Sequence, residues 1–591
     1  MTIQARKLFK EVWSNLYRHK FTYYSRAVLL QLFMTTLGVG LMKLVFQFIL
    51  LTSGQENLTK DSLLAMLVNP LSLLLIIIFI LVMAGLIFFE FSVLTLMVYG
   101  SYQENYFSWK SLFKNAWLSW RKLNWRQFPV FLLYLISMIP VANLGLSSIL
   151  TENLFIPKFI SGELTKTSLG AVAYPLLLLV FAYINFRLLF TLPLTVTNHQ
   201  SLSANIKTSW NLTKKGKFKL GLVWGSFELI LSLLALLLIT LLLVAMILLD
   251  PQGSNLFYET IFFTSLKVLI FFFSLLSKLS IVAIMVRIMV EQGEVREAIL
   301  GHEKEEPKKS KFLSILVTLA LLLTLVNNSL ILFTTDFNKD SLTIGHRGYV
   351  SKGVENSLEG LEGAAKEGVD YVEMDILLTK DHKFVVMHDY NLKRLAGLDK
   401  KVQDMTFDEL VGLPISQDGH KSKLPSFEEF VQKAKELKVK LLVELKPHGA
   451  EPANYVDLFI KEMRRLGVEH DYKVMSLDLK IMEAIEKQAP DMDTGYVIPL
   501  QFGDFAKSKV DFFVIEDFSY NDALVAQAHK DKKEVFVWTI NEEEQMVKYL
   551  EKPVTGIITD YPNLVNKEKQ ELKEKNTYFD KLLRQLVTSL K

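Results

Sequence analysis

The sequence predicts a multi-domain protein with two structural parts: an α-helical membrane domain of about seven transmembrane helices, then an α/β domain folded as a (β/α)8 TIM barrel. Two observations lead to this fold class. Hydrophobic residues make up 50% of the 591, and nearly all the long apolar runs lie in residues 1–335. From residue 341 onward, short β-type runs alternate with helical patterns over ~230 residues, which is typical of a parallel barrel.

The composition excludes some classes of protein. The chain has no cysteine, and its 66 Lys and Arg nearly balance its 62 Asp and Glu, for a net charge of +4. So hydrophobic a chain is neither disordered nor a disulfide-stapled mini-protein. The small net charge gives no support for a nucleic-acid partner, and we expect none.

Seven runs are long enough to cross a bilayer, which takes about 18 or more apolar residues. The first is too long and too far from residue 1 for a cleaved signal peptide. Seven such runs within 335 residues disfavour the alternative, which is a large soluble protein with buried helices. The expected spans are residues 27–52, 70–99, 127–150, 168–197, 219–249, 258–290 and 313–334.

The basic residues of the intervening loops predict the orientation of the spans. Lys and Arg are frequent in residues 1–26, 100–126, 199–219 and 291–312, and sparse in the alternate loops. Because positive loops stay on the cytoplasmic side, we expect a cytoplasmic N-terminus and an extracytoplasmic domain after the seventh span.

Three of the basic segments resemble one another and predict amphipathic helices at the inner membrane surface. They share an apolar residue, a lysine, a tryptophan three residues later and then a further basic residue. The segments begin Phe9-Lys10-x-x-Trp13, Phe113-Lys114-x-x-Trp117 and Ile206-Lys207-x-x-Trp210.

Seven charged residues fall inside the expected spans. Charges in lipid are costly and usually face a bundle interior or a wet cavity. They indicate either a polar path or headgroup site between helices, or structural pairing of buried charges with snorkelling near the span ends. The residues are Lys43, Glu90, Arg187, Glu228, Lys267, Lys278 and Arg287.

Nine β-type runs follow residue 341, one more than a barrel needs. The polar turn at 379–383 is too short for a helix, so the second and third runs are expected to form a hairpin. The runs are 342–345, 371–376, 384–387, 441–445, 474–476, 495–498, 512–515, 535–538 and 556–558.

Polar side chains collect where these runs end, which is where a TIM barrel places its catalytic groups. Residues two apart on a strand share a face, as Glu373 and Asp375 do, and likewise Glu444 and Lys446. The other polar groups at strand ends are His346, Arg347, His388 and Trp538.

These residue types together fit the cleavage of a phosphodiester. Three carboxylates without sulfur suit Mg²⁺ or Ca²⁺. Two histidines suit an acid and a base, and Arg347 and Lys446 suit a phosphate. Each motif alone is weak: a Glu-x-Asp pair is also common at a solvated strand edge, and Glu444 with Lys446 could be a salt pair. Their joint occurrence at successive strand ends is much stronger.

These residues resemble the glycerophosphodiester phosphodiesterase family over residues 340–565. The membrane half also resembles, more loosely, the multi-spanning domain fused to this enzyme in some Gram-positive bacterial members. The matching motifs are His346-Arg347-Gly348 with Glu355-Asn356-Ser357, Val372-Glu373-Met374-Asp375, Val386-Met387-His388-Asp389, Leu424-Pro425-Ser426-Phe427-Glu428-Glu429, Leu442-Val443-Glu444-Leu445-Lys446-Pro447, Val537-Trp538-Thr539-Ile540-Asn541 and Gly556-Ile557-Ile558-Thr559-Asp560-Tyr561-Pro562.

The resemblance implies an enzyme that releases an alcohol and glycerol 3-phosphate, either by direct water attack or through a cyclic phosphate formed by the substrate's 2-hydroxyl. It also implies a role for each motif residue. One divalent cation, Mg²⁺ or Ca²⁺, would be held by Glu373, Asp375 and Glu444; acid–base work would fall to His346 and His388, phosphate binding to Arg347 and Lys446, support to Glu355 and glycerol packing to Trp538.

The expected domains are a membrane domain at 1–335, a barrel at 336–565 and an amphipathic helix at 566–591. The resemblance places a small insertion that caps the site at residues 389–440. The C-terminal helix is expected to dock on the barrel; lying on the membrane or mediating dimerisation are its alternatives. Three histidines without motif support, His382, His420 and His448, are expected on the surface.

The sequence therefore predicts a bacterial cell-membrane enzyme that holds its barrel close to the bilayer, because the linker at 335–340 spans at most ~20 Å. We expect membrane lipid contacts and a glycerophosphodiester substrate: a deacylated phospholipid, a lysophospholipid or a polyglycerophosphate. The sequence does not identify protein partners. The alternatives are a lipid transporter or sensor with the barrel as a binding module, and a lyase that stops at the cyclic phosphate.

Overall fold

The computed structural model describes residues 4–54, 57–58, 66–138, 168–294, 311–505 and 507–589. The chain divides into two compact units. One consists of Met1–Ser53 with Met66–Leu330, and the other of Gly54–Ala65 with Ile331–Lys591.

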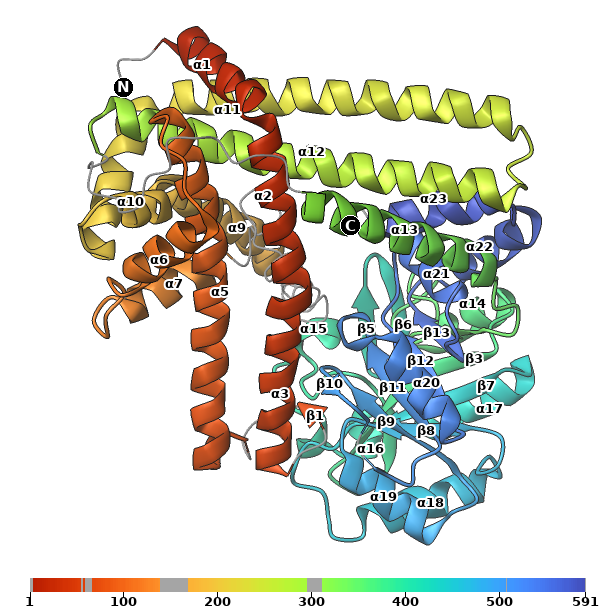
Figure 1. The fold of residues 1–591 in the computed structure, drawn as a ribbon. Coiled ribbons are helices and arrows are strands. Elements are labelled where there is room, and N and C mark those ends of the chain that lie inside the picture. Colours follow the sequence, from red (N-terminus) through yellow and green to blue (C-terminus); the bar gives the residue numbers. More distant parts are fainter. Residues whose placement is uncertain are drawn as a thin grey trace. The chain divides into compact units, whose positions relative to one another are not determined.

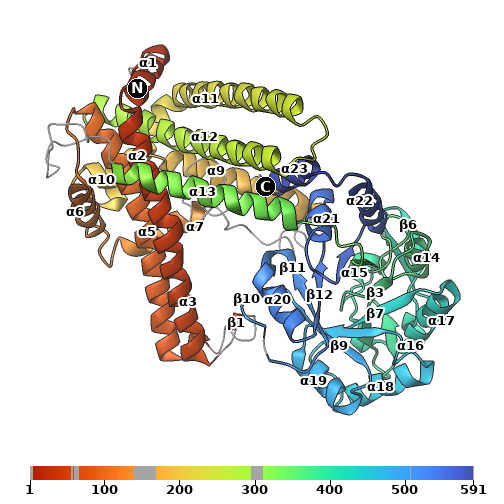
Figure 2. The ribbon, with the colours of Figure 1, turned by 45° about the vertical axis from the view of Figure 1, so that its right-hand side comes forward.

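The first unit is helical (Figure 1). Two of its antiparallel pairs lie side by side in Figures 1 and 2, α3 with α5 and α11 with α12. Its described elements are α1 (Ala5–Arg18), α2 (Lys20–Phe33), the π-helix η1 (Met34–Gly38), α3 (Val39–Ser53), α5 (Pro70–Tyr102), α6 (Trp109–Trp120), α7 (Phe128–Met138), α9 (Ser168–Leu188), α10 (Thr191–Thr197), α11 (Leu202–Leu249), α12 (Leu256–Glu291) and α13 (Lys311–Thr334).

The predicted helical membrane domain is confirmed, with six described helices long and apolar enough to cross a bilayer. They are Lys20–Ser53, Pro70–Tyr102, Gly170–Thr197, Leu220–Leu249, Leu256–Glu291 and Ser314–Thr334. The seventh expected span, 127–150, begins in the short apolar helix α7, and its remainder lies outside the described residues. Many leucines of these helices are exposed, for example Leu236 and Leu323, as a lipid-facing surface requires.

The charges within the spans whose contacts the structure describes have polar partners. Arg287 pairs with a carboxylate, whereas the described contacts of Glu228 are to neutral groups and not to the Lys or Arg expected for it. The contacts join Arg287 Nη2 to Glu11 Oε2 at 2.8 Å, Glu228 Oε1 to Ser277 Oγ at 2.7 Å, Lys267 Nζ to Asn328 Oδ1 at 2.8 Å, and Glu90 Oε1 to Gln31 Nε2 at 3.2 Å. Arg187 lies over the ring of Trp210, 4.5 Å from its centroid.

The three similar basic segments are all helical, but they do not form three separate helices. The first two lie in α1 and α6. The third forms the start of α11, which continues for 48 residues without a break through the segment predicted as a span. No proline separates the two parts, and the helix continues through Gly216 and Gly221, since a single glycine is tolerated inside a helix.

The second unit contains a closed parallel barrel of eight strands, as predicted. The sheet order is β2-β13-β12-β11-β9-β8-β7-β3, and β2 also pairs with β3, which closes the ring. The strands are β2 (Leu342–Gly345), β3 (Tyr371–Leu378), β7 (Lys440–Leu445), β8 (Lys473–Ser476), β9 (Asp493–Ile498), β11 (Phe512–Glu516), β12 (Glu534–Trp538) and β13 (Gly556–Thr559).

The ninth run is β4 (Phe384–Val386), which pairs antiparallel with β3 in the expected hairpin. Outside the barrel, β1 (Asn57–Leu58) pairs with β10 (Phe502–Gly503). The barrel helices are α14 (Leu358–Lys366), α17 (Phe427–Leu437), α18 (Tyr455–Leu466), α19 (Leu479–Gln488), α20 (Asp522–Lys530), α21 (Glu543–Leu550) and α22 (Pro562–Glu574), with the short 3-10 helix η4 (Asp517–Ser519) after β11.

The barrel has an inner and an outer apolar core. The inner core fills the ring with side chains such as Leu442, Val514 and Phe536, while a larger cluster lies between the strands and the helices. Gly495 is required inside the ring, because a Cβ there would lie 2.0 Å from the Phe512 side chain. The packed interior leaves only the strand ends free to carry a site.

A small subdomain follows β4 and has its own apolar core, including Leu395, Val402 and Ile415. It contains α15 (Lys393–Ala396), the 3-10 helix η3 (Val402–Asp404), α16 (Phe407–Leu410) and the hairpin of β5 (Pro414–Gln417) and β6 (His420–Lys423). We call these residues, 390–424, the insertion. It is shorter than predicted, because α17 packs on β4 and β7 as a barrel helix.

The last helix, α23 (Tyr578–Ser589), packs against α21. Its apolar stripe buries Leu582, and Arg584 Nε lies 2.6 Å from Glu551 Oε1. The helix therefore docks on the barrel, which is the arrangement favoured from the sequence.

Candidate active site

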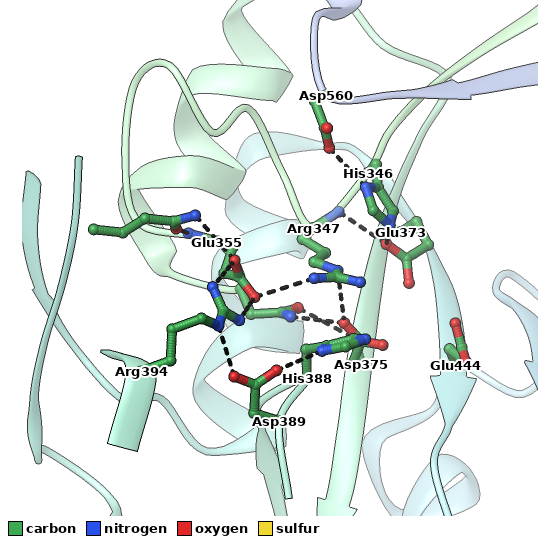
Figure 3. A network of polar contacts seen from close by, with 12 residues as sticks. His346, Arg347, Glu355, Glu373, Asp375, His388, Asp389, Arg394, Glu444 and Asp560 are labelled. Atoms are coloured by element: carbon green, nitrogen blue, oxygen red, sulfur yellow. Dashed lines mark hydrogen bonds and ion pairs between the residues drawn. The ribbon is translucent and has the colours of Figure 1, made fainter. Parts of the chain in front are cut away.

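The carboxyl ends of the barrel strands bring the predicted site residues together (Figure 3). His346 and Arg347 follow β2, Glu373 and Asp375 lie on β3, and Glu444 lies on β7 beside Asp375 in the strand register. Residues from distant parts of the sequence thus share one end of the ring.

Three carboxylates form a buried acidic cluster: Glu373, Asp375 and Glu444. Each offers an oxygen within 4.8 Å of the others. Burial, followed by the charges of Asp375 and Glu444, raises the pKa of Glu373 well above its usual value. Burial also raises the pKa of Glu444 to about 7, assisted by Asp375 and opposed by Lys446.

This cluster fits a divalent cation. Glu373 Oε1 and Glu444 Oε1 are buried without a hydrogen-bond partner among the described residues. Buried carboxylate oxygens that repel one another and lack donors are stabilised by a hard cation such as Mg²⁺ or Ca²⁺.

Two cations border the acidic cluster. Lys446 Nζ lies 3.5 Å from Asp375 Oδ1 and 3.8 Å from Glu444 Oε1. Arg347 Nε lies 3.3 Å from Asp375 Oδ2. Burial opposes ionisation of Asp375, but Lys446, His388 and Arg347 hold its pKa well below the usual range. The site therefore combines a cation pocket with two fixed positive charges.

The loop after β2 turns sharply to place Arg347. Its backbone is left-handed at Arg347 and at Gly348, with φ of 56° and 94°. A Cβ on Gly348 would lie 2.7 Å from the Gly360 carbonyl carbon, so only glycine fits. The turn directs the Arg347 backbone N–H to Glu373 Oε2, at 2.8 Å.

Asn356 holds Asp375 through Oδ2, whereas Lys446 lies near Oδ1. Its Nδ2 donates to Asp375 Oδ2 at 2.8 Å, and its Oδ1 accepts from the Asp375 backbone N–H at 3.1 Å. Its φ of 58° is in the left-handed region, which asparagine tolerates better than most residues.

His346 is oriented by an acidic partner. Its Nδ1 lies 2.6 Å from Asp560 Oδ1, and Nε2 lies 4.0 Å from Glu373 Oε2. Burial opposes ionisation of Asp560, but His346 and the amide of Asn541 bring its pKa down to about 2. An ionised Asp560 accepts a hydrogen bond from Nδ1–H, so Nε2 faces the acidic cluster.

His388 is oriented in the same way by its neighbour in sequence. Nδ1 lies 2.7 Å from Asp389 Oδ1. Despite burial, His388 and Arg394 keep the pKa of Asp389 well below its usual value. Burial and the charge of Arg347 lower the pKa of His388, so its imidazole is neutral near pH 7.

Glu355 lies under these groups and is 3% exposed. It accepts hydrogen bonds from Arg347, Arg394 and Gln417, at 3.2, 2.5 and 3.0 Å for the shortest contact of each. Burial opposes ionisation, but the two guanidinium groups bring the pKa of Glu355 down to about 2.

Glu355, His388 and Asp389 also offer ligand atoms close enough for a metal ion. The Arg394 guanidinium already contacts oxygens of both carboxylates. The Arg394 guanidinium therefore neutralises this second cluster, and the cluster does not resemble a metal site.

Trp538 ends β12, next to Glu516 at the end of β11. Its indole Nε1 is buried without a hydrogen-bond partner among the described residues. Buried indole N–H groups usually find an acceptor, so this one is available to a ligand.

Sequence reasoning missed several residues that hold the site. Asp389 and Asp560 lie within the quoted motifs. Asp389 follows His388 directly, which could have suggested its orienting role, whereas Asp560 is 214 positions from His346 and meets it only in the closed barrel. Arg394 and Gln417 gave no such signal, since only the folded insertion brings them to Glu355. The expected surface position holds for exposed His382, but not for His448, whose side chain is 9% exposed and 3.2 Å from Glu451.

Comparison with known proteins covers both units. Residues 9–326 match the membrane domain of glycerophosphoryl diester phosphodiesterase, and residues 346–564 match the glycerophosphoryl diester phosphodiesterase family. A glycerophosphodiester phosphodiesterase from Caldanaerobacter subterraneus is 26% identical over 239 residues, 38% of this chain and 98% of the relative. The human lysophospholipase D GDPD1 is 24% identical over 269 residues, 37% of this chain and 83% of the relative.

Among solved structures, a phosphodiesterase from Oleispira antarctica in complex with the product sn-glycerol-3-phosphate is 20% identical. It has a TM-score of 0.35 over 38% of this chain and 96% of its own. A glycerophosphodiester phosphodiesterase from Thermotoga maritima is 25% identical, with a TM-score of 0.31 over 38% of this chain and 97% of its own.

The fold and the site thus define a barrel phosphodiesterase joined to a helical membrane domain. Because the membrane-domain match alone spans more than half of the sequence, and the barrel match most of the rest, the assignment does not depend on either unit alone. The chain belongs to the glycerophosphoryl diester phosphodiesterase family.

Proposed function

We propose that this chain is a membrane-anchored, metal-dependent glycerophosphodiester phosphodiesterase that hydrolyses its substrate to an alcohol and glycerol 3-phosphate. One observation carries the proposal. A buried cluster of three carboxylates adjoins two fixed cations and two histidines, each oriented by an aspartate. A bound cation, two fixed positive charges and an acid–base pair are the groups that phosphodiester cleavage needs.

Glu373, Asp375 and Glu444 would hold the divalent cation. Once bound, it neutralises charge on the phosphate and stabilises the charge that develops during cleavage. Arg347 and Lys446 add positive charge beside the same pocket, and both are held in place by Asp375.

The two histidines divide the proton transfers. Each presents Nε2 to the site, because its Nδ1 faces a carboxylate. One histidine takes the proton of the attacking hydroxyl, while the other gives a proton to the leaving alcohol oxygen. The attacking group is water or the substrate's own 2-hydroxyl; the second route passes through a cyclic phosphate that water then opens.

The membrane unit supports a location at the bacterial cell membrane. The basic loops favour a cytoplasmic N-terminus and an extracytoplasmic barrel. A barrel tethered to the bilayer favours substrates made there: lysophospholipids, deacylated phospholipids or polyglycerophosphate. A lysophospholipase D among the relatives makes lysophospholipids part of the test.

The test is product release by purified full-length protein from glycerophosphocholine, glycerophosphoethanolamine, a lysophospholipid and a glycerophosphate polymer. The product read is glycerol 3-phosphate, or acylglycerol 3-phosphate in the case of the lysophospholipid. We expect release with Mg²⁺ or Ca²⁺, none with EDTA and none from His346→Ala. A cyclic phosphate as the only product would indicate a lyase. No product, with folded and metal-loaded protein, would favour a lipid transporter or sensor.

A further inference from the structure

Arg394 belongs to the insertion, on the short helix α15, yet its side chain reaches into the site (Figure 3). Nη1 and Nη2 donate to Glu355 Oε2 and Oε1 at 2.7 and 2.5 Å, and Nε donates to Asp389 Oδ2 at 2.7 Å. One guanidinium therefore uses three of its N–H groups to join two carboxylates.

Each of these carboxylates in turn holds a group of the proposed machinery. The other oxygen of Asp389 faces His388 Nδ1 at 2.7 Å. Glu355 Oε1 accepts from Arg347 Nη1 at 3.2 Å. Arg394 therefore reaches His388 through Asp389 and reaches Arg347 through Glu355. It contacts neither His388 nor Arg347 directly in any described contact.

The geometry requires a cation at this place. Glu355 is 3% exposed, and an oxygen of Asp389 lies within 4.8 Å of one of its own. Without Arg394 the two negative charges would repel, and Asp389 would be free to turn away from His388. A lysine would supply the charge but cannot donate in a planar fork to both carboxylates.

We propose that Arg394 is a positioning residue that fixes the His388 tautomer and ring orientation through Asp389 and the Arg347 guanidinium through Glu355, so that the insertion controls the rate of the barrel chemistry. This inference rests on the proposed phosphodiesterase function.

Gln417, on β5 of the same insertion, supplies an internal comparison. Its Nε2 donates to Glu355 Oε2 at 3.0 Å, and its Oε1 accepts from the Glu355 backbone N–H at 2.9 Å. It supports Glu355 without a described contact to Asp389. Loss of Gln417 therefore disturbs only one of the two arms that Arg394 holds.

Arg465 is a matched control outside the site. It also joins two carboxylates, Glu428 and Glu462, each at 2.8 Å from Nη2. These residues lie on α17 and α18, so Arg465→Ala removes a double ion pair of the same kind from a more exposed place on the same barrel, and it should leave the rate unchanged.

The kinetic test compares full-length Arg394→Ala, Arg394→Lys, Gln417→Ala and Arg465→Ala. Arg394→Ala should lower kcat about 100-fold, the lower end of what a positioned acid or base contributes. Gln417→Ala should lower kcat by less than about tenfold. Added guanidinium ion should restore part of the rate to Arg394→Ala only. In an Asp389→Asn background, Arg394→Ala should cost less than it does alone, because the Asp389 arm is already disturbed and only the Glu355 arm remains to be lost.

A second readout needs no substrate. In protein labelled with ¹⁵N-histidine, with His388 assigned from the signal lost in His388→Ala, the wild type should show the Nδ1–H tautomer, and Arg394→Ala a mixture. If the wild type releases no glycerol 3-phosphate, the proposed function fails, while the tautomer still tests Arg394. The inference would be overturned if Arg394→Ala kept the wild-type tautomer of His388 or had a kcat within threefold of wild type. An equal loss of kcat in Arg465→Ala would also overturn it.

Discussion

His346 Nδ1 lies 2.6 Å from Asp560 Oδ1, although the two residues are 214 positions apart. His346 follows the first barrel strand and Asp560 the last, and these strands pair directly as the ring closes. The orientation of His346 is therefore a product of barrel closure.

The first prediction concerns this pair. Asp560→Asn keeps the shape of the side chain but removes the carboxylate that accepts the hydrogen bond from His346 Nδ1–H. His346 should then adopt the wrong tautomer, and kcat should fall by roughly 10²–10⁴-fold with little change in KM. Steady-state kinetics of the full-length protein measure this.

The control is Asp493→Asn, which removes an ion pair with Lys473 at the other end of the barrel. Its activity should match the wild type. Full activity of Asp560→Asn would show that the aspartate does not orient the histidine.

The second prediction concerns stability against pH in metal-free protein. Burial raises the pKa of Glu444 to about 7, from an ordinary value of 4.5. The folded barrel thus binds this proton more tightly than the unfolded chain does. The resulting stability is complete below pH 4.5 and is lost as the pH rises to about 7. Thermal proteolysis of EDTA-treated protein should show this loss.

Glu444→Gln isolates the effect of this carboxyl, because His388, with its lowered pKa, acts in the opposite direction below pH 6.5. The thermal unfolding midpoint of the metal-free variant should rise relative to that of the wild type as the pH increases from 5 to 8. The variant should also bind Mg²⁺ or Ca²⁺ more weakly. A constant difference between the two proteins across this range would contradict the assignment.

The third prediction concerns the unpartnered indole of Trp538. Trp538→Phe keeps an aromatic ring and removes the Nε1 donor, which is buried without a described partner. If the donor binds a hydroxyl on the glycerol side of the substrate, KM should rise about tenfold, the value of one hydrogen bond, with kcat nearly unchanged. An unchanged KM would remove Trp538 from the substrate contacts.

The fourth prediction concerns the membrane unit. Arg287 and Glu11 join α12 to α1 with two contacts of 2.8 Å. Arg287→Gln and Glu11→Gln each leave the other residue's charge without this partner. Each variant should lower the unfolding midpoint in detergent by several degrees. The double variant should lose less than the sum of the singles, because the two residues share one interaction. Additive losses would mean that the pair contributes nothing of its own.

The sequence predicted the architecture well because its signals are local. Apolar runs mark the spans, and the short turn at 379–383 distinguished the β3–β4 hairpin from a ninth barrel strand. The acidic cluster was visible because Glu373, Asp375 and Glu444 lie at strand ends, where topology alone brings them together.

The remainder of the site depends on tertiary packing. No periodicity links Arg394 to Glu355. The insertion packs through an apolar cluster that it shares with Leu377 and Val385 of the β3–β4 hairpin, and this packing brings Arg394 to Glu355. The uninterrupted α11 was missed for a similar reason. A basic surface segment and an apolar span look like two elements in sequence, and Gly216 and Gly221 between them resemble a helix end, yet both lie inside the helix.

The most direct test of the account is ³¹P NMR of full-length protein with each glycerophosphodiester of the panel in turn, recorded over time with the divalent cation and again with EDTA. The account predicts that the diester signal decays into that of glycerol 3-phosphate with the cation, and persists with EDTA and in His346→Ala. An unchanged diester signal in the presence of folded, metal-loaded wild-type protein, for every substrate of the panel, would contradict it.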